Sequence, residues 1–219
     1  MTERLICLII GYLFGTFQSG YFMGKLRGFD IRSYGSHSTG ATNSLRVMGT
    51  GAGVLVLLGD ALKAIIPCVA ARLCFASSPE IQMLMVLWTS VGVMLGHDYP
   101  FYLGFRGGKG VASTVGVLIA FDIRLALLWC AVFLLVAVTT RYVSLSSITA
   151  MAFLLVFSVM LYLRGALPVA APHSTEFLLL AVFIPALSIF RHRTNIGRLL
   201  AGTESRVKLF TRGMDVDKK

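Results

Sequence analysis

Charge is scarce in this sequence, and acidic residues are the scarcest charged type. Only 14% of the 219 residues are charged, with 10 Asp and Glu against 20 Lys and Arg, whereas 56% are hydrophobic. The mean hydropathy of +0.79 is far from the average of soluble proteins, which excludes an ordinary soluble domain and indicates a polytopic membrane protein. No polar stretch is long enough to bury its own core, so we expect a single polytopic membrane domain over residues 1–219.

Cysteine pairs at metal-binding or redox spacing are also missing. The four cysteines lie in apolar segments without Cys-x-x-Cys spacing, and we interpret them as small buried hydrophobic residues. Neither a disulfide framework nor a zinc site is therefore favoured. The first residues do not resemble a cleaved signal peptide, because Glu3 lies in the charged region and no small-residue cleavage site interrupts the apolar stretch up to Met23.

Long apolar runs make up most of the chain. They lie at Leu5–Met23, Gly51–Cys74, Ile81–Leu95, Gly110–Phe121, Leu125–Thr140, Ile148–Leu163 and Phe177–Phe190. A helix needs about 20 residues to cross the hydrocarbon core, with about 17 as a lower limit. The fourth run is shorter, so we expect it to form a half-helix or to extend back into the preceding glycine-rich segment. The pattern predicts an all-α integral membrane protein, a bundle of about seven transmembrane helices.

Lys and Arg are distributed unevenly between the loops on the two sides of the membrane. With the N-terminus outside and the C-terminus in the cytoplasm, the cytoplasmic side holds fifteen of them, including the tail residues Lys208, Arg212, Lys218 and Lys219. The external side keeps only four, which are Arg4, Arg72, Arg124 and Arg164. The positive-inside rule favours this orientation. The net charge of +10 is explained by this face, which also attracts anionic lipid headgroups, so nucleic-acid binding is not required.

Small and ionisable residues inside the apolar runs indicate helix packing. Glycines recur four positions apart in the first run and just beyond it, which lets helices approach closely, at Gly11, Gly15, Gly20 and Gly24. Asp60 and Lys63 are three residues apart, so they share one helix face. Each would cost about 2.5–3.5 kcal/mol in a membrane if unpaired. We expect them either to pair with each other or to face a polar cavity.

Three polar segments fall on the predicted cytoplasmic side. They are RSYGSHSTGATNSLR (Arg32–Arg46), GHDYPFYLGFRGGKGVAST (Gly96–Thr114) and HRTNIGRLLAGTESR (His192–Arg206). The glycines and cations between Arg106 and Gly110 suit an anion such as phosphate, because glycine exposes backbone N–H groups. This is not a Walker A loop, which would need Gly at position 103 and Ser or Thr at position 110. The three segments together predict a polar site at one end of the bundle.

GATNSLR, GHDYPFYLGFRGGKGVAS and HRTNIGRLLAGTES resemble the three motifs of the PlsY family of bacterial membrane glycerol-3-phosphate acyltransferases, which use acyl phosphate. The resemblance covers essentially the whole chain. It implies transfer of a fatty acyl group from acyl phosphate to the sn-1 hydroxyl of glycerol 3-phosphate, giving lysophosphatidic acid and phosphate for phospholipid biosynthesis. It also implies a multi-pass protein of the bacterial plasma membrane whose active site faces the cytoplasm. No cofactor, metal ion or obligate protein partner is expected.

The resemblance assigns roles to matching positions. Ser36, Arg46 and Lys109 would contact phosphate, and His192 and Asn195 would position glycerol 3-phosphate. Further substrate-binding residues are expected at Ser38, Gly40, Thr42, Asn43, Arg106, Gly107, Gly108, Gly110 and Ser147, with Ser144 and Ser146 as alternatives to Ser147. Structural roles are expected for Asp60, Lys63 and Glu204. Either His192 or a phosphate oxygen of the substrate would accept the proton of the attacking hydroxyl, and we favour the phosphate.

Three positions depart from the family pattern. His37 and Ser38 stand where Gly and Asn are usual, and Arg106 stands where Lys is usual. Because a side chain restricts positive φ, we expect the loop at His37 to differ in shape. Arg106 preserves the charge of the usual residue.

Two other functions remain as alternatives to acyl transfer from acyl phosphate. A membrane transporter for phosphorylated anions would use the same cationic pocket, but the sequence shows no inverted repeat that would support it. Acyltransferases that use thioesters carry an Asp five residues after a His, and none of the four histidines has one.

Overall fold

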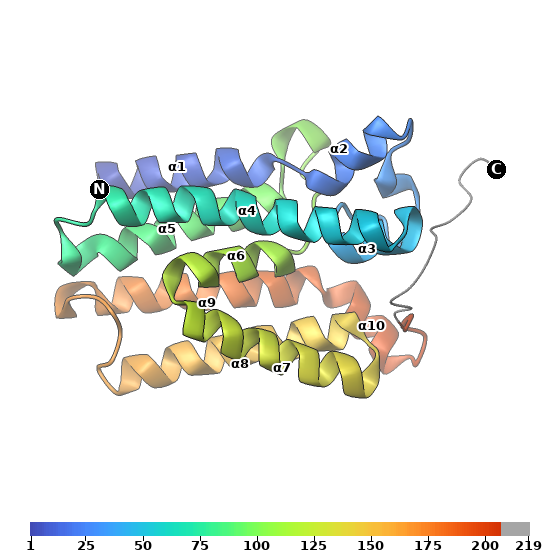
Figure 1. Cartoon of the computed structure of the whole chain (residues 1–219). Coiled ribbons are helices and arrows are strands. Elements are labelled where there is room, and N and C mark those ends of the chain that lie inside the picture. Colours follow the sequence, from blue (N-terminus) through green and yellow to red (C-terminus); the bar gives the residue numbers. More distant parts are fainter. Residues whose placement is uncertain (207–219) are drawn as a thin grey trace.

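The computed structural model describes residues 1–206, all of whose regular elements are helices (Figure 1). The predicted tail cations Lys208, Arg212, Lys218 and Lys219 lie outside the described residues. The longer helices are α1 (Thr2–Thr16), α4 (Thr50–Cys74), α5 (Pro79–Asp98), α7 (Ile123–Thr140), α8 (Val143–Leu163) and α9 (Ser174–Arg191). The shorter elements are α2 (Ser19–Leu26), η1 (Ile31–Ser33), α3 (Ala41–Met48), η2 (Phe101–Leu103), α6 (Val111–Phe121), η3 (Ala171–His173) and α10 (Arg193–Leu200).

Six segments of the described chain are long and apolar enough to cross a membrane. They run through α1 and α2, α4, α5, α7, α8 and α9. The remaining apolar helix, α6, has 11 residues and therefore covers about 16 Å, roughly half of the hydrocarbon core. The predicted all-helical membrane bundle is confirmed, and its fourth apolar run is the half-helix. α6 begins at Val111, so the preceding glycine-rich segment stays non-helical.

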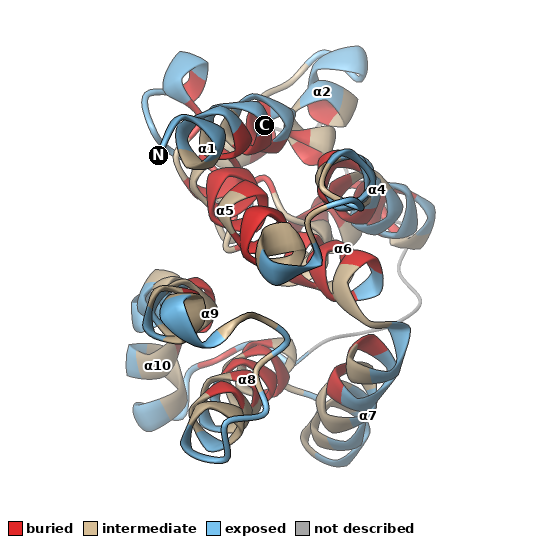
Figure 2. Ribbon diagram, turned by 90° about the vertical axis from the view of Figure 1, so that its left-hand side faces the viewer, coloured by how far each residue is buried: buried red, intermediate tan, exposed pale blue. Residues whose placement is uncertain are grey.

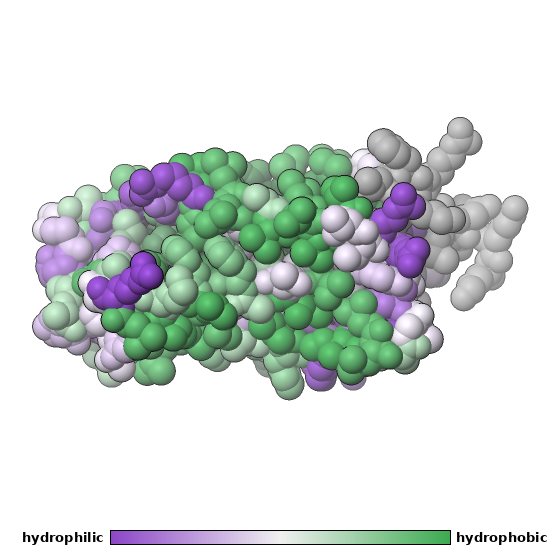
Figure 3. All heavy atoms as spheres, turned by 90° about the horizontal axis from the view of Figure 1, so that it is seen from below, coloured by the Kyte–Doolittle hydropathy of each residue, from purple (hydrophilic) through white to green (hydrophobic). Residues whose placement is uncertain are grey.

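Burial separates the core helix from the lipid-facing ones (Figure 2). In the most apolar 18-residue stretch of α5 and η2, 61% of the residues are buried, whereas only 11% are buried in the corresponding stretch of α7. The exposed side chains of α7 include Leu127, Leu134 and Leu135, which suit contact with lipid. On the face drawn in Figure 3, hydrophobic residues cover the middle and hydrophilic residues gather toward the two ends. This is the surface of a membrane-spanning bundle.

Glycines bring α1 and α5 into close contact. A Cβ atom added at Gly11 would lie 2.1 Å from the carbonyl oxygen of Thr89, and one at Gly15 would lie 2.2 Å from that of Val93. Glycine is therefore required here by the neighbouring backbone, as the spacing predicted. The packing fixes α1 against α5, whose last turn leads into the second polar segment.

Candidate active site

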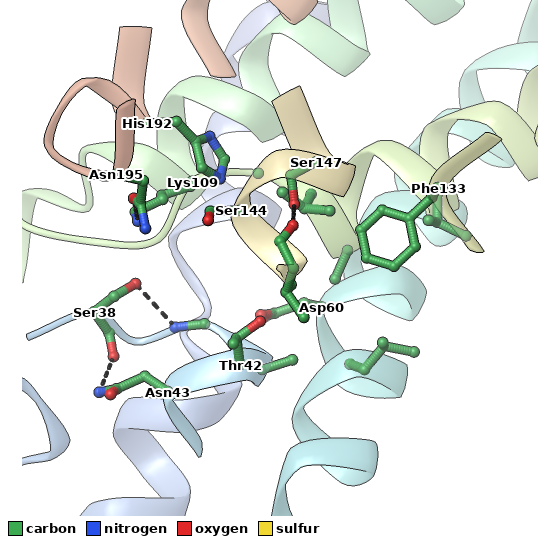
Figure 4. A pocket seen from close by; sticks show the side chains of 18 of the residues that line it. Ser38, Thr42, Asn43, Asp60, Lys109, Phe133, Ser144, Ser147, His192 and Asn195 are labelled. Carbon is green, nitrogen blue, oxygen red and sulfur yellow. Dashed lines mark hydrogen bonds between the residues drawn. The ribbon is translucent and has the colours of Figure 1, made fainter. Parts of the chain in front are cut away.

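A cavity of about 320 Å³ lies where the three polar segments meet (Figure 4). Helices α2, α3 and α10 gather at the end of the bundle opposite the N-terminus. The predicted convergence of the segments is thus confirmed. Of the predicted residues, the cavity is lined by Ser36, Ser38, Gly40, Thr42, Asn43, Arg46, Asp60, Lys109, Gly110, Ser147, His192, Asn195 and Glu204. The structure does not place Lys63, Arg106, Gly107 or Gly108 in its wall.

Four helices begin at this cavity. Residues at the starts of α3, α6, α8 and α10 line it, and no side chain caps these N-termini. Uncapped N-termini present free backbone N–H groups and a positive dipole end, which favour anions. Only the contribution of α6 was foreseen from the sequence, since it follows the glycine-rich segment directly. Together with Arg46 and Lys109, the four termini make this end of the cavity electropositive.

Lys109 lies between the loop and the third segment. Its ammonium group donates a hydrogen bond to Oδ1 of Asn195, and the hydroxyl of Ser188 donates to its backbone carbonyl over 2.8 Å. Burial, reinforced by the nearby guanidinium of Arg198, lowers the pKa of Lys109 to about 8. A lysine held among cations is a good anion ligand, because a bound phosphate relieves the repulsion.

Glu204 holds the third segment together. Its Oε1 accepts hydrogen bonds from Asn195 Nδ2 and Ser144 Oγ, both over 2.9 Å, and its Oε2 accepts from Arg198 Nε over 2.6 Å. Burial raises the pKa of this carboxyl, but the three donors outweigh it and leave the pKa below its usual value. Because the side-chain nitrogen of Asn195 donates to Glu204, the side-chain oxygen of Asn195 is turned toward Lys109. This geometry is what the predicted structural role of Glu204 requires.

The three candidate serines of α8 differ in position. Ser147 and Ser144 line the cavity, whereas the hydroxyl of Ser146 bonds to the carbonyl of Tyr142 over 2.8 Å and lies outside the lining. The Ser144 hydroxyl donates to the Glu204 carboxylate, and the Ser147 hydroxyl donates to the backbone carbonyl of Val143 over 2.7 Å. The contact of Ser147 with substrate stays a prediction.

His192 is buried at the wall of the cavity. Its Nδ1 lies 2.8 Å from the carbonyl oxygen of Ser188, which can only accept, so Nδ1 carries the hydrogen and Nε2 has the free lone pair. Burial, reinforced by the charge of Lys109, lowers the pKa of His192 to about 4. The imidazole is therefore neutral at pH 7 and costly to protonate.

The first polar segment is shaped by Asn43. Its amide nitrogen donates to the carbonyls of Tyr34 and Ser38 over 3.1 and 2.8 Å, and its oxygen accepts from the backbone N–H of Ser36 over 2.8 Å. His37 adopts φ = 56°, the conformation that glycine takes most easily. His37 thus adopts the left-handed conformation despite its side chain, and the expectation that this loop differs in shape from that of the family stays a prediction.

The glycine-rich loop uses its amides within the protein. Gly107 and Gly108 donate backbone N–H bonds to the carbonyls of Asp98 and His97, over 3.1 and 3.0 Å. A Cβ at Gly108 would lie 2.0 Å from Nε2 of His97, so packing alone demands glycine there. Arg106 is exposed. The expectation that Gly107 and Gly108 offer free amides to phosphate is not met, since the end of α5 already accepts them.

His97 is a site residue that the sequence reading missed. It lines the cavity, and its Nδ1 accepts a hydrogen bond from Lys63 Nζ over 2.8 Å. Lys63 Nζ also donates to the carbonyl of Phe17 over 2.5 Å and pairs with Asp60 Oδ1 at 3.1 Å, so its three hydrogens have three acceptors. Both expectations for Asp60 hold, because it pairs with Lys63 and lines the cavity. The signal in the sequence that could have identified His97 was its position in GHDYP, beside the glycine-rich loop.

Replacing Lys109 with arginine tests its charge through a pH profile. With a pKa of about 8, Lys109 is protonated below that pH and loses its charge above it, so kcat/KM should fall as the pH rises through about 8. The second pKa of a phosphate monoester such as the expected glycerol 3-phosphate is about 6, so titration of that phosphate does not cause this limb. Arginine keeps its charge, and we expect the Lys109→Arg variant to retain kcat/KM to higher pH. Identical alkaline limbs in the two proteins would contradict the assignment.

The fold and the cavity define an integral membrane protein with an electropositive pocket at one end of its helix bundle. The model of the family described as glycerol-3-phosphate acyltransferase matches residues 5–202, nearly the whole chain. The chain therefore belongs to the glycerol-3-phosphate acyltransferase family and is an enzyme of that family. The transporter alternative is not supported.

Relatives and solved structures agree over the same length. The chain is 38% identical over 208 residues to a glycerol-3-phosphate acyltransferase of Trichlorobacter lovleyi, covering 95% of this chain and 100% of the relative. It is 41% identical over 206 residues to one of Aquifex aeolicus, covering 93% and 99%. The crystal structure of PlsY (YgiH), an integral membrane glycerol 3-phosphate acyltransferase, in its glycerol 3-phosphate form matches with a TM-score of 0.80 and 40% identity, covering 94% and 96%. Its lysophosphatidic acid form matches with 0.78 and 38%, covering the same shares.

Proposed function

We propose that this enzyme transfers a fatty acyl group from acyl phosphate to the sn-1 hydroxyl of glycerol 3-phosphate. The observation that carries the proposal is the convergence of four uncapped helix N-termini with Arg46 and Lys109 on one cavity. Both substrates carry phosphate, and such a pocket suits two phosphoryl groups. The glycerol 3-phosphate and lysophosphatidic acid forms of the matching PlsY structures support the same acceptor and product.

The other wall of the cavity is apolar and suits an acyl chain. It contains Leu57 of α4, Val115 of α6, and Phe133 and Leu134 of α7. Figure 4 shows Phe133 on the side away from Lys109 and Asn195. Leu57 is 46% exposed and Leu134 57% exposed, so the wall reaches the lipid-facing surface. A donor with a charged head and an apolar tail can therefore enter sideways from the membrane.

The chemistry requires no covalent enzyme intermediate. The sn-1 hydroxyl oxygen attacks the acyl carbonyl carbon, the bond from that carbon to the phosphate oxygen breaks, and inorganic phosphate leaves with its electron pair. Arg46 can clamp a phosphoryl group bidentately, and Lys109 acts as a point charge. Positioning the hydroxyl and neutralising the departing phosphate supply most of the rate.

A phosphate oxygen of a substrate accepts the hydroxyl proton in this scheme. The lowered pKa of His192, about 4, makes the imidazole a weak base, whereas a phosphate monoester has a second pKa of about 6. The free lone pair on Nε2 of His192 instead accepts a hydrogen bond that orients the glycerol hydroxyl. Asn195 is held in place by Glu204 and accepts a hydrogen bond from Lys109. It thereby positions Lys109 to bind the same substrate.

The protein is proposed to lie in the bacterial plasma membrane with the cavity facing the cytoplasm. The uneven distribution of Lys and Arg supports this orientation, with the N-terminus outside. A cytoplasmic cavity would also open to the compartment that contains glycerol 3-phosphate.

Donor competition tests the proposal. Purified protein in detergent micelles is offered acyl phosphate, acyl-CoA and acyl carrier protein thioester separately, each with glycerol 3-phosphate. We expect lysophosphatidic acid and free phosphate in equal amounts from acyl phosphate, and neither product when glycerol 3-phosphate is left out. Preferred use of a thioester, or acylation at the second hydroxyl, would refute the proposed donor or position.

A further inference from the structure

A second apolar cavity follows the first along α6, α7 and α8. Its volume is about 60 Å³, and it is lined from these helices by side chains that include Leu118, Leu125, Leu154 and Phe157. On α7, Leu125 lines the second cavity, whereas Trp129, one helical turn further along, lines the first. On α8, Ser147 lines the first cavity and Leu154 the second. The two cavities therefore lie end to end along these three helices, and α5 and α9 also line the second one.

A compact partition separates them. Trp129 and Met151 belong to one buried cluster with Leu118, Ala126, Ala150 and Leu154. Trp129 is 1% exposed and Met151 0% exposed. Met151 lies on α8 midway between Ser147 and Leu154, and it lines neither cavity. The partition thus consists of the Trp129 ring on the side of the first cavity, backed by Met151.

The indole of Trp129 contributes bulk to this wall. Its ring lies 5.8 Å from that of Phe133, which lines the same cavity, with an interplanar angle of 16°. Its Nε1 is buried and has no hydrogen-bond partner among the described residues. A tryptophan whose N–H is unused supplies the size and shape of its ring, so the position is defined by the space that it fills.

We propose that this partition, with Trp129 as its face, sets the length of acyl chain that the enzyme accepts. The inference rests on the proposed function, which places the donor head among Lys109 and the helix N-termini and its tail along the apolar wall. A tail that runs between α6, α7 and α8 meets Trp129, which lines the first cavity next to the second. The second cavity beyond it would accommodate further methylenes if the partition were smaller.

A chain-length series measures this directly. Wild type, Trp129→Ala and Trp129→Phe are assayed for kcat/KM with saturated acyl phosphates that differ by two carbons. We expect Trp129→Ala to move the optimum to longer chains, with a gain of about fourfold for each methylene newly buried. Trp129→Phe keeps most of the wall and should stay close to wild type. Leu127→Ala, on the same helix but 64% exposed, is the matched control and should not shift the optimum.

Met151→Ala provides a second route if Trp129→Ala does not yield folded protein. It removes the backing of the wall and should shift the optimum in the same direction. A folded Trp129→Ala or Met151→Ala enzyme that keeps the wild-type ratio between long and short chains would overturn the partition and leave the proposed function intact. A wild-type enzyme inactive with every acyl phosphate, but active with a thioester, would instead overturn the proposed function.

Discussion

Lys109→Ala should lower kcat/KM by about a hundredfold or more while the protein stays folded. Lys109 is the cation of the glycine-rich segment that lines the cavity and contacts Asn195. Removing one charge-assisted contact to a departing phosphate costs about 3 kcal/mol in the transition state, which corresponds to the expected loss of rate. The measurement is phosphate release from acyl phosphate in the presence of glycerol 3-phosphate. Arg46→Ala is expected to have an effect of similar size.

Lys25→Ala is the control for this experiment. Lys25 is an exposed lysine near the same end of the bundle that does not line the cavity, so its loss should leave turnover near wild type. Elution as a single species in size-exclusion chromatography shows that each variant is folded. Near-normal activity in both Lys109→Ala and Arg46→Ala would refute the role of these cations in holding phosphate.

Lys63→Met should destabilise the protein by about 3–5 kcal/mol, because it leaves the buried carboxylate of Asp60 without its counter-charge. Asp60 is 1% exposed, and its Oδ1 would keep the hydrogen bond that the hydroxyl of Ser19 donates over 3.0 Å. The carbonyl of Phe17 and Nδ1 of His97 also lose their donor. In a chain of this size the midpoint of thermal unfolding should fall by on the order of 10 °C.

The double variant Asp60→Asn with Lys63→Met separates charge from packing. It removes both charges and keeps an oxygen for Ser19, so it should unfold at a higher temperature than Lys63→Met alone. Thermal unfolding followed by circular dichroism in detergent gives the comparison. Equal midpoints for the single and double variants would show that the unpaired charge is not the source of the loss.

The membrane-spanning helices could be predicted from the sequence because the lipid requires every span to be apolar along its own length. A span must be apolar over about 20 residues, so the runs at Gly51–Cys74 and Leu125–Thr140 mark α4 and α7 closely. Gly11 and Gly15 could likewise be interpreted from their spacing alone. The short fourth run left two possibilities, and only the structure shows that α6 begins at Val111 and does not extend back into the preceding glycine-rich loop.

The residues of the site could be predicted from the sequence only in part. Motif resemblance named Arg46, Lys109, His192 and Asn195, and all four line the cavity. His97 was missed because its partner Lys63 is distant in sequence and meets it only when α4 packs beside α5. Free amides were expected at Gly107 and Gly108, but the end of α5 accepts their hydrogens. Such contacts depend on which helices become neighbours, and no local pattern encodes that.

The sequence by itself determined a helical membrane protein, its apolar spans and the three polar segments, because hydropathy and residue spacing act within one segment. Tertiary structure alone decided that four helix N-termini converge on one cavity. It also decided that Asp60, Lys63 and His97 form one buried group, and that Trp129 and Met151 divide two cavities. The physical reason is that convergence of dipoles, pairing of buried charges and filling of space all depend on distances between segments, which are set when the helices pack.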